Sequence, residues 1–196
     1  MLERDLDPDP LAQFRRWFAE ALEEVSLGEA AALATSTRQG RPSLRMVLVK
    51  SFDERGFVFH SNYRSRKGLE LARNPEAALL FHWKELGRQI RIEGSTERIT
   101  AAESDAYFAG RPRRSQLGAV VSAQSQPLPS KEELDRRVEE LQRSLGEVPV
   151  LRPDWWGGYR LAPRTYEFWQ HREDRLHERW SYVRQGDGWA RSRLQP

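Results

Sequence analysis

A serine followed by two cations, Ser65-Arg66-Lys67, stands just after a predicted strand and at the start of a predicted helix. Free backbone N–H groups and the positive end of the helix dipole both favour an anion at such a place. The guanidinium of Arg66 can bind two phosphate oxygens at once, and Lys67 adds a point charge. The run therefore suits a phosphate dianion. A capped helix whose cations face solvent explains the same three residues, so the run alone decides nothing.

A second group that could bind phosphate combines a phenol, a guanidinium and a hydroxyl. Tyr107 and Arg111 are four residues apart and would share one face at the end of a predicted helix. A proline then turns the chain and brings Ser115 close to them. These residues predict a second phosphate pocket. A basic surface loop, for example one that binds nucleic acid, explains this segment equally well when it is taken alone.

A third segment with titratable side chains, Arg175-Leu176-His177-Glu178-Arg179, lies near the end of the sequence. If the segment is extended, Arg175, His177 and Arg179 share one face of a strand. Such groups repel one another unless an anionic or electron-rich partner faces them. An exposed strand face is the alternative. A lone histidine is most often structural or exposed, so His177 carries little weight by itself.

The run Arg45-Met46-Val47-Leu48-Val49-Lys50 reads as a half-buried strand with a cation at either end. Strand alternation puts Arg45 with the two valines on one face, and Lys50 with Met46 and Leu48 on the other. A cation at the end of so apolar a run is expected to reach a partner, or else to extend its charged tip into solvent.

The elements that must position these residues are strands at both ends of the chain with helices between them. Apolar spacing predicts helices over residues 10–25, 65–74, 100–109 and 130–145, with Asp9 capping the first, and Thr100 with Glu103 forming a capping box. Strands are expected over 31–37, 43–52, 57–61, 77–83, 88–99, 158–161, 165–170 and 180–183, with a linker at 126–129 and a hairpin turn at 186–188.

The turns between these strands are short, which favours antiparallel pairing over βαβ units. The expected fold class is therefore mainly β with helices (α+β), an antiparallel β-barrel decorated by helices. Residues 1–196 are expected to form a single domain, with 1–26 as an N-terminal helix.

The composition excludes several classes of protein. The chain has 196 residues and no cysteine, so disulfides, thiolate metal sites and cysteine nucleophiles are excluded. Its four histidines show no ligand spacing, and no metal is expected. No apolar run approaches a membrane span and the acidic start is not a signal peptide, so a cytoplasmic protein without a membrane partner is expected. The net charge of +3 is small and spread along the chain, which does not favour nucleic acid as a partner.

Taken in order, these segments resemble the pyridoxine (pyridoxamine) 5'-phosphate oxidase family over nearly the whole chain, from Asp9-Pro10-Leu11 to Arg193-Leu194-Gln195-Pro196. One short motif often agrees by chance, whereas an ordered set does not. The most specific parts are Arg45 to Lys50, Ser65-Arg66-Lys67, Arg88-Gln89, Arg111-Pro112-Arg113-Arg114-Ser115-Gln116, Trp155-Trp156-Gly157-Gly158, Glu167-Phe168-Trp169-Gln170 and Arg175-Leu176-His177-Glu178-Arg179.

The resemblance implies an FMN-binding split barrel that works as a homodimer, with FMN at the subunit interface. It assigns FMN contacts to Arg45, Met46, Val47, Leu48, Val49, Lys50, His60, Ser61, Arg66, Lys67, Gln89, Gln124, Ser125, Trp169 and Arg179. It assigns substrate contacts to Lys50, Tyr107, Arg111, Ser115, Arg175, Leu176 and His177. Among these, Arg175 and His177 would be catalytic, because they would position the reacting ring over the flavin.

The reaction implied by the resemblance is oxidation of pyridoxine 5'-phosphate or pyridoxamine 5'-phosphate to pyridoxal 5'-phosphate. A hydride would pass to the flavin from the substrate carbon that bears the alcohol or amine. Oxygen would then reoxidise the flavin and give hydrogen peroxide, and the amine substrate would also release ammonia by imine hydrolysis. Ser65-Arg66-Lys67 would take the FMN phosphate, and the residues from Tyr107 to Ser115 the substrate phosphate.

The sequence departs from the family pattern in three places. His60 stands where the family commonly has tyrosine, and His171-Arg172 replaces small residues after the Trp-Gln pair. The chain also starts close to Asp9-Pro10, without the basic segment that can fold over the substrate in relatives. This start predicts either a more open site or a trimmed chain.

Three other functions compete with this interpretation. A flavin oxidase of phenazine biosynthesis resembles the same family but should need no pocket for a substrate phosphate. A non-catalytic flavin-binding protein could keep Ser65-Arg66-Lys67 and lose the Tyr107 group, and here both are present. A nucleic-acid-binding module would explain the arginines but not their grouping into two anion pockets.

Overall fold

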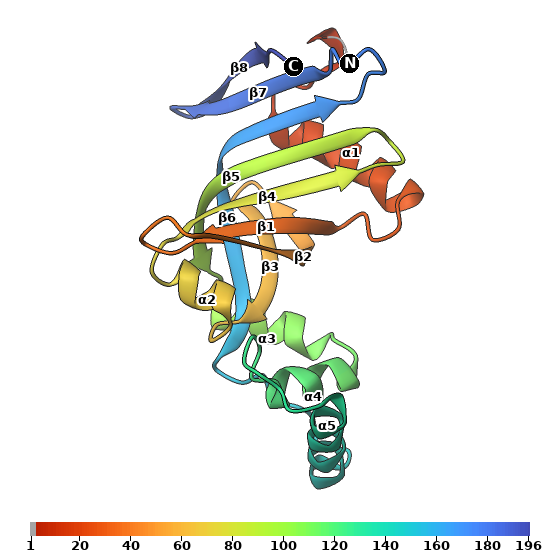
Figure 1. Cartoon of the computed structure of the whole chain (residues 1–196), viewed down its shortest axis with the longest axis vertical. Helices are drawn as coiled ribbons and strands as arrows, with labels where there is room; N and C mark the ends of the chain where they lie inside the picture. The colour runs from red at the N-terminus through yellow and green to blue at the C-terminus, as the bar shows by residue number, and fades with distance from the viewer. Residues whose placement is uncertain (1–2) are drawn as a thin grey trace.

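The computed structural model describes residues 3–196, an antiparallel barrel with the helices of residues 101–145 clustered below it (Figure 1). Met1 and Leu2, the first residues of the predicted N-terminal segment, lie outside the described residues. The strands are β1 (Ala30–Ser36), β2 (Pro42–Asp53), β3 (Gly56–Asn62), β4 (Glu76–Trp83), β5 (Arg88–Arg98), β6 (Trp156–Gln170), β7 (Glu178–Gln185) and β8 (Gly188–Leu194). The helices are a short 3₁₀ turn η1 (Glu3–Asp5), α1 (Pro10–Glu24), α2 (Arg66–Leu71), α3 (Ala101–Ala109), α4 (Arg113–Val121) and α5 (Lys131–Leu145).

The strands form one sheet in the order β3-β2-β1-β4-β5-β6-β7-β8, and β3 also pairs with β6. That extra pairing, in which Phe57 lies opposite Leu161, closes six strands into a barrel. β7 and β8 continue the sheet beyond β6 at the top of Figure 1. Each pairing among the described strands is antiparallel, as the short turns predicted. The expected fold class, a mainly β split barrel decorated by helices, is confirmed.

Helix α1 fills the barrel with aromatic side chains. Asp9 caps it by accepting hydrogen bonds from the N–H groups of Leu11 and Ala12, and proline occupies the first turn, as predicted. The Phe14 ring is fully buried among three rings from different strands. These rings belong to Phe52, Phe57 and Phe81, with centroids 4.9, 4.8 and 5.2 Å from that of Phe14. The apolar face of the amphipathic helix α1 is buried against the barrel, so the helix and the barrel stabilise each other.

A second, smaller core lies under the helices at the other end of the barrel. Phe108 of α3, Leu117 of α4 and Val138 of α5 pack with Trp156, the first residue of β6. The capping box at the start of α3 is present as predicted. The buried Arg160 of β6 ties this helix to the barrel, with ion pairs to Glu103 at 3.3 Å and to Asp53 at 2.6 Å. α3 is therefore held at a fixed position relative to the strands.

The structure corrects several predicted boundaries. The two strands expected at 158–161 and 165–170 are one strand, β6, because the proline between them lies at a register shift, where a missing N–H is tolerated. No helix was predicted after Pro112, where the chain was expected only to turn, but this segment is helix α4. The helix expected over 65–74 ends at Leu71. β8 carries few apolar residues and gave no strand signal, but it pairs with β7 along its whole length.

Gly94 lies at the register shift between β5 and β6, close to the backbone of Ala162. An added Cβ would lie 1.9 Å from the carbonyl oxygen of Ala162. We expect Gly94→Ala to lower the free energy of unfolding by about 2–4 kcal/mol, because the barrel must open to admit the methyl group.

Gly118 provides a matched control for this substitution, because a Cβ there would meet no atom within 4 Å. Gly118→Ala lies inside α4 and should leave stability unchanged or raise it by about 0.5–1 kcal/mol. Chemical denaturation measures both variants. Equal unfolding midpoints would contradict the steric account of Gly94.

Candidate functional site

The first group of predicted phosphate ligands is assembled where β3 runs into α2. Ser65 caps α2 by accepting a hydrogen bond from the backbone of Gly68. Lys67 Nζ donates to Ser61 Oγ and to Gln124 Oε1, both at 3.1 Å. Burial, together with the charge of Arg45, lowers the pKa of Lys67. An ammonium that is partly desolvated among other cations is a favourable site for an anion.

A carboxylate that the sequence did not suggest lies among these cations. The buried Glu70 accepts hydrogen bonds from Thr35, Ser43 and Arg66, and it forms an ion pair with Arg45. Burial alone would raise the pKa of Glu70, but the hydrogen bonds and the charge of Arg45 outweigh it and lower the pKa to about 2. Glu70 is therefore ionised near pH 7. The only sequence signal for it was its i,i+4 spacing from Arg66.

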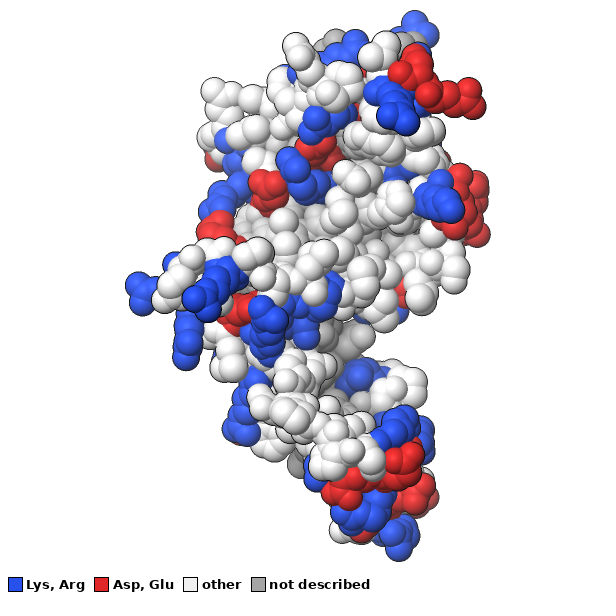
Figure 2. Space-filling view, in the orientation of Figure 1, with Lys and Arg blue, Asp and Glu red and all other residues white. Residues whose placement is uncertain are grey.

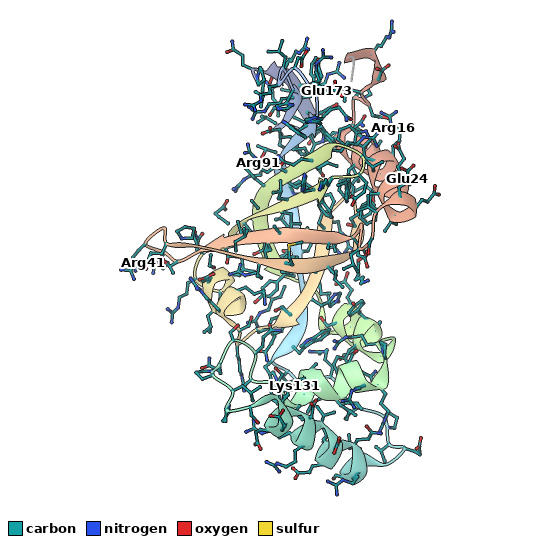
Figure 3. The ribbon with its side chains drawn as sticks, turned by 45° about the vertical axis from the view of Figure 1, so that its right-hand side comes forward. Arg16, Glu24, Arg41, Arg91, Lys131 and Glu173 are labelled. Atoms are coloured by element: carbon teal, nitrogen blue, oxygen red, sulfur yellow. The ribbon has the colours of Figure 1, made fainter. Side chains whose placement is uncertain are left out.

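A hollow of about 640 Å³ opens beside α2. Arg66, Glu70 and Ser125 line it, together with side chains of the β1–β2 turn. Lys and Arg side chains gather on the surface over α2 and that turn (Figure 2). In Figure 3, Arg41 extends from the tip of the same turn. The hollow is thus bordered by positive charge with one buried carboxylate at its wall.

The second group of predicted phosphate ligands comes from β3, α3 and α4. The His60 ring stacks on the Tyr107 ring at 3.6 Å between centroids, and the Arg111 guanidinium lies over Trp156 at 4.6 Å. Arg111 and Ser115 line a hollow of about 260 Å³ that also reaches Gln124. The two groups are therefore adjacent, with Gln124 touching both.

Buried polar atoms in the second group lack partners. Both ring nitrogens of His60 and Nη1 of Arg111 are buried without a hydrogen bond. Burial, and then the charge of Arg111, lowers the pKa of His60 to about 4, so its ring is neutral near pH 7. An unpaired buried guanidinium nitrogen costs free energy that a bound anion would recover. This geometry suits a phosphate at Arg111.

The third group does not have the predicted extended form. Arg175 has a φ of +62°, in the left-handed region, and β7 begins only at Glu178, so Arg175, His177 and Arg179 do not share a strand face. Asp174 causes the turn, because its side chain accepts the Leu176 N–H at 3.0 Å.

The ring of Trp169 is the centre of this third group. Its centroid lies 4.6 Å from that of His177, and the register places it between Gln89 of β5 and Arg179 of β7. His177 Nδ1 accepts the Arg172 N–H at 3.2 Å. Nε2 is therefore the ring nitrogen that carries the proton when His177 is neutral.

The alternation predicted for Arg45 to Lys50 is present in β2. Val47 and Val49 are buried, whereas Met46 and Leu48 are 63% and 41% exposed. Buried valine side chains cannot touch a ligand outside the barrel, so a contact there would come from the backbone. Lys50 lies on the outer face and pairs with Glu29 at 2.8 Å.

The second and third groups lie at opposite ends of β6. Trp156, beside Arg111, is its first residue, and Trp169, beside His177, is the last but one. The strand between them has a contour length of roughly 40 Å. In Figure 3, Glu173, in the loop of the third group, lies near the top of the molecule, and Lys131 of α5 lies in its lower half. One chain therefore does not bring Arg111 and His177 to a common ligand.

Within residues 3–196, no group of three or more His, Cys, Asp or Glu side chains could hold a metal ion. Among the same residues, no helix is long and apolar enough to cross a membrane.

Comparison with known families decides what the chain is related to. Residues 18–144 match the family model described as pyridoxamine 5'-phosphate oxidase. Residues 156–196 match that of the pyridoxine 5'-phosphate oxidase C-terminal dimerisation region. The chain belongs to the pyridoxine/pyridoxamine 5'-phosphate oxidase family. It is therefore an oxidoreductase, as the resemblance implied.

Members of this family match along almost their whole length. A pyridoxine/pyridoxamine 5'-phosphate oxidase of Rubrobacter xylanophilus is 58% identical over 100% of this chain and 91% of its own. The enzyme of that name from Cupriavidus taiwanensis is 52% identical over 99% of this chain and 92% of its own.

Solved structures support the same fold. PhzG from Burkholderia lata 383, in complex with tetrahydrophenazine-1-carboxylic acid, is 36% identical, with a TM-score of 0.92, and the match covers 100% of this chain and 98% of PhzG. A pyridoxamine 5'-phosphate oxidase-related, FMN-binding protein of Nostoc punctiforme is 19% identical, with a TM-score of 0.78 over 97% of this chain and 100% of that one. The second likeness shows the fold alone.

The His60 ring of this family member provides a pH-dependent prediction. The pKa of His60 is about 4 in the folded protein, against a usual value of 6.5. The unfolded chain therefore binds a proton more readily, and the stability due to neutral His60 is present above pH 6.5 and lost as the pH falls toward 4. His60→Phe keeps a ring stacked on Tyr107 but has no group to protonate. As the pH falls from 6.5 to 4, we expect the free energy of unfolding to fall by about 2 kcal/mol less in this variant than in the wild type.

Denaturant unfolding at a series of pH values measures this difference. His82→Phe is the matched control, because His82 lies exposed on β4. An identical pH dependence in wild type and His60→Phe would contradict the prediction.

Proposed function

We propose that this protein oxidises pyridoxine 5'-phosphate or pyridoxamine 5'-phosphate to pyridoxal 5'-phosphate, using FMN and oxygen. The observation that carries the proposal is the pair of adjacent anion-binding groups that meet at Gln124. A flavin mononucleotide and a phosphorylated substrate each need such a group, and they must lie close enough for their rings to meet. The names of the 58% and 52% identical relatives agree with this substrate class.

The residues of the first group fit a cofactor phosphate. Arg66 offers a guanidinium fork and is hydrogen-bonded to Glu70, Lys67 offers an ammonium, and Ser61 offers a hydroxyl. When bound, FMN would accept the hydride from the substrate and pass the electrons to oxygen, giving hydrogen peroxide. We propose that the predicted cofactor residues (Arg45, Met46, Val47, Leu48, Val49, Lys50, His60, Ser61, Arg66, Lys67, Gln89, Gln124, Ser125, Trp169 and Arg179) form this site, with the valines contributing backbone.

The second group fits the phosphate of the substrate. Arg111 and Ser115, which line the smaller hollow, would donate to this phosphate, and the Tyr107 hydroxyl would complete the pocket. Lys50 would add its charge when it leaves Glu29. A substrate without the phosphate would leave Arg111 unpaired and should bind weakly.

The third group fits the reacting end of the substrate. Arg175, Leu176 and His177 lie together on a tight turn, in which Asp174 fixes the backbone. Because His177 Nδ1 accepts the Arg172 N–H, its Nε2 faces the other way and would hydrogen-bond to the alcohol or amine of the substrate, holding it in place while that group gives up its hydride and a proton. Pyridoxamine 5'-phosphate would lose a hydride from its amine-bearing carbon, and water would then release ammonia from the resulting imine.

A homodimer would complete this site. The second and third groups are at opposite ends of β6, so a bound substrate would need the third group from a second copy. Leu44, Met46 and Leu48 form an exposed apolar stripe on β2, and a partner would cover it. The name of the family model over residues 156–196 also agrees with pairing. We propose that FMN lies at the interface between the two copies.

The experiment is to purify the protein and record its visible spectrum before and after addition of FMN. Pyridoxine or pyridoxamine 5'-phosphate is then added in air, and pyridoxal 5'-phosphate and peroxide are followed. Bound flavin with formation of both products is expected. A protein that takes up no FMN would overturn the proposal.

A phenazine-type oxidation is the second candidate, because PhzG is 36% identical with a TM-score of 0.92. The two candidate functions differ in whether the substrate needs a phosphate group. Turnover of pyridoxamine 5'-phosphate but not of pyridoxamine supports our proposal, whereas turnover only of reduced phenazine carboxylic acids would favour the alternative.

A further inference from the structure

Glu70 places a negative charge in the group of residues that is proposed to bind the negatively charged phosphate of FMN. Its side chain is only 7% exposed, and it lies next to Arg45 and Arg66. Like charges at short range repel, so a buried carboxylate here should weaken the binding of an anion unless a second effect compensates for the repulsion. The hydrogen bonds of Glu70 indicate such an effect.

Both oxygens of Glu70 are used to join three elements. Oε2 accepts from Thr35 of β1 and Ser43 of β2, each at 2.5 Å, and pairs with Arg45 Nη2 at 3.3 Å. Oε1 accepts from Arg66 Nε at 3.0 Å. β1, β2 and α2 therefore meet at one carboxylate.

These contacts restrict the two guanidiniums. Arg45 is 20% exposed and donates also to Thr35 Oγ1 at 2.5 Å and to the Leu33 carbonyl at 3.2 Å. Arg66 is 63% exposed, and among the residues that the structure describes Glu70 is the only side chain that hydrogen-bonds to it. Without Glu70, the Arg66 side chain would sample many rotamers and lose that entropy on binding.

We infer that Glu70 is a positioning residue that fixes the Arg45 and Arg66 guanidiniums in advance for the phosphate of the flavin cofactor. This inference rests on the proposed function. Glu70 also balances charge: Arg45, Arg66 and Lys67 are three cations and Glu70 is one anion, which leaves a net charge of +2. A phosphate monoester carries about −1.5 to −2 near pH 7 and matches that value.

The test compares two flavins that differ only in the phosphate. Full-length protein stripped of flavin is titrated with FMN and with riboflavin, and the quenching of flavin fluorescence gives each Kd. We expect Glu70→Gln to weaken FMN binding by about tenfold, the scale of one lost charge-assisted hydrogen bond, and to change riboflavin binding less than about twofold.

The outcomes distinguish positioning of the arginines by Glu70 from simple repulsion of the phosphate and from a general structural role. Tighter FMN binding by Glu70→Gln would mean that the carboxylate acts by repulsion, and unchanged binding would mean that it has no part in binding the phosphate; either result would overturn the inference. Equal losses for FMN and riboflavin would indicate a general structural role and would also overturn it. A wild-type protein that does not prefer FMN to riboflavin would instead refute the proposed function.

Two further variants keep the test decisive. Glu97→Gln makes the same chemical change at an exposed position of β5 and should change neither Kd. Ser43→Ala removes one donor to Glu70 and should weaken FMN binding in the same direction but less. Thermal unfolding of each stripped variant establishes that it is folded, and if Glu70→Gln does not fold, Ser43→Ala decides between the outcomes above.

Discussion

Arg111→Ala should lower kcat/KM for pyridoxamine 5'-phosphate by about 100-fold or more while FMN stays bound. Arg111 has a buried nitrogen without a protein partner, and its guanidinium is held over Trp156 at 4.6 Å. Removal of one partner from a buried charged pair typically costs about 2–5 kcal/mol, and each 1.4 kcal/mol is tenfold in rate. Steady-state kinetics and the flavin absorbance of the purified variant measure both quantities.

Arg114→Ala is the matched control for this loss. Arg114 is an arginine three residues further along, 68% exposed, whose partner is Asp135 at 3.7 Å on the surface. Its removal should change kcat/KM less than about twofold, because exposed ion pairs contribute little. Loss of flavin from Arg111→Ala, or equal losses in the two variants, would refute the assignment of Arg111 to the substrate phosphate.

Mixing two inactive variants should restore activity. Arg111→Ala removes a side chain of the second group, and Arg175→Ala removes one of the third. A homodimer of either variant carries its substitution in both copies, so both of its sites should be defective. In a mixed dimer, one site would receive both substitutions and the other neither. Random pairing makes half the dimers mixed, each with one intact site, so about one quarter of the wild-type activity is expected.

The control is to mix two variants of the same group. Arg111→Ala with Ser115→Ala should give no recovery, because every site in that mixture keeps at least one defect in its phosphate pocket. The variants are unfolded and refolded together, and activity is compared with that of each variant refolded alone. If Arg111→Ala and Arg175→Ala do not complement each other, the site is not shared between copies in the way proposed.

Much of the fold followed from local patterns in the sequence. Asp9-Pro10 with the aromatic spacing of α1, and the capping box at Thr100, were sufficient because each involves contacts within a few residues. Short turns predicted the antiparallel barrel. Closure of the barrel by β3 and β6 joins residues about a hundred positions apart, and only the general architecture could be expected from the sequence.

The site was harder to predict wherever a single side chain changes the backbone or crosses between elements. Asp174 bends the chain before Arg175, and a strand pattern does not reveal such a turn. Glu70 reads as a helix-surface partner of Arg66, but it is buried because β1 and β2 supply hydroxyls to it. The roles assigned to the site residues, and the single domain over 1–196, stay predictions.

The position of Gln124 between the first and second groups has a thermodynamic consequence. Gln124 accepts hydrogen bonds from Ser61 and Lys67 on one side and lines the Arg111 hollow on the other. A residue shared by two binding sites links their equilibria, and such linkage is reciprocal. By whatever factor cofactor occupancy changes the affinity for substrate, substrate occupancy must change the affinity for cofactor by the same factor. If the two proposed sites hold FMN and the phosphorylated substrate, any such coupling would pass through the Gln124 side chain.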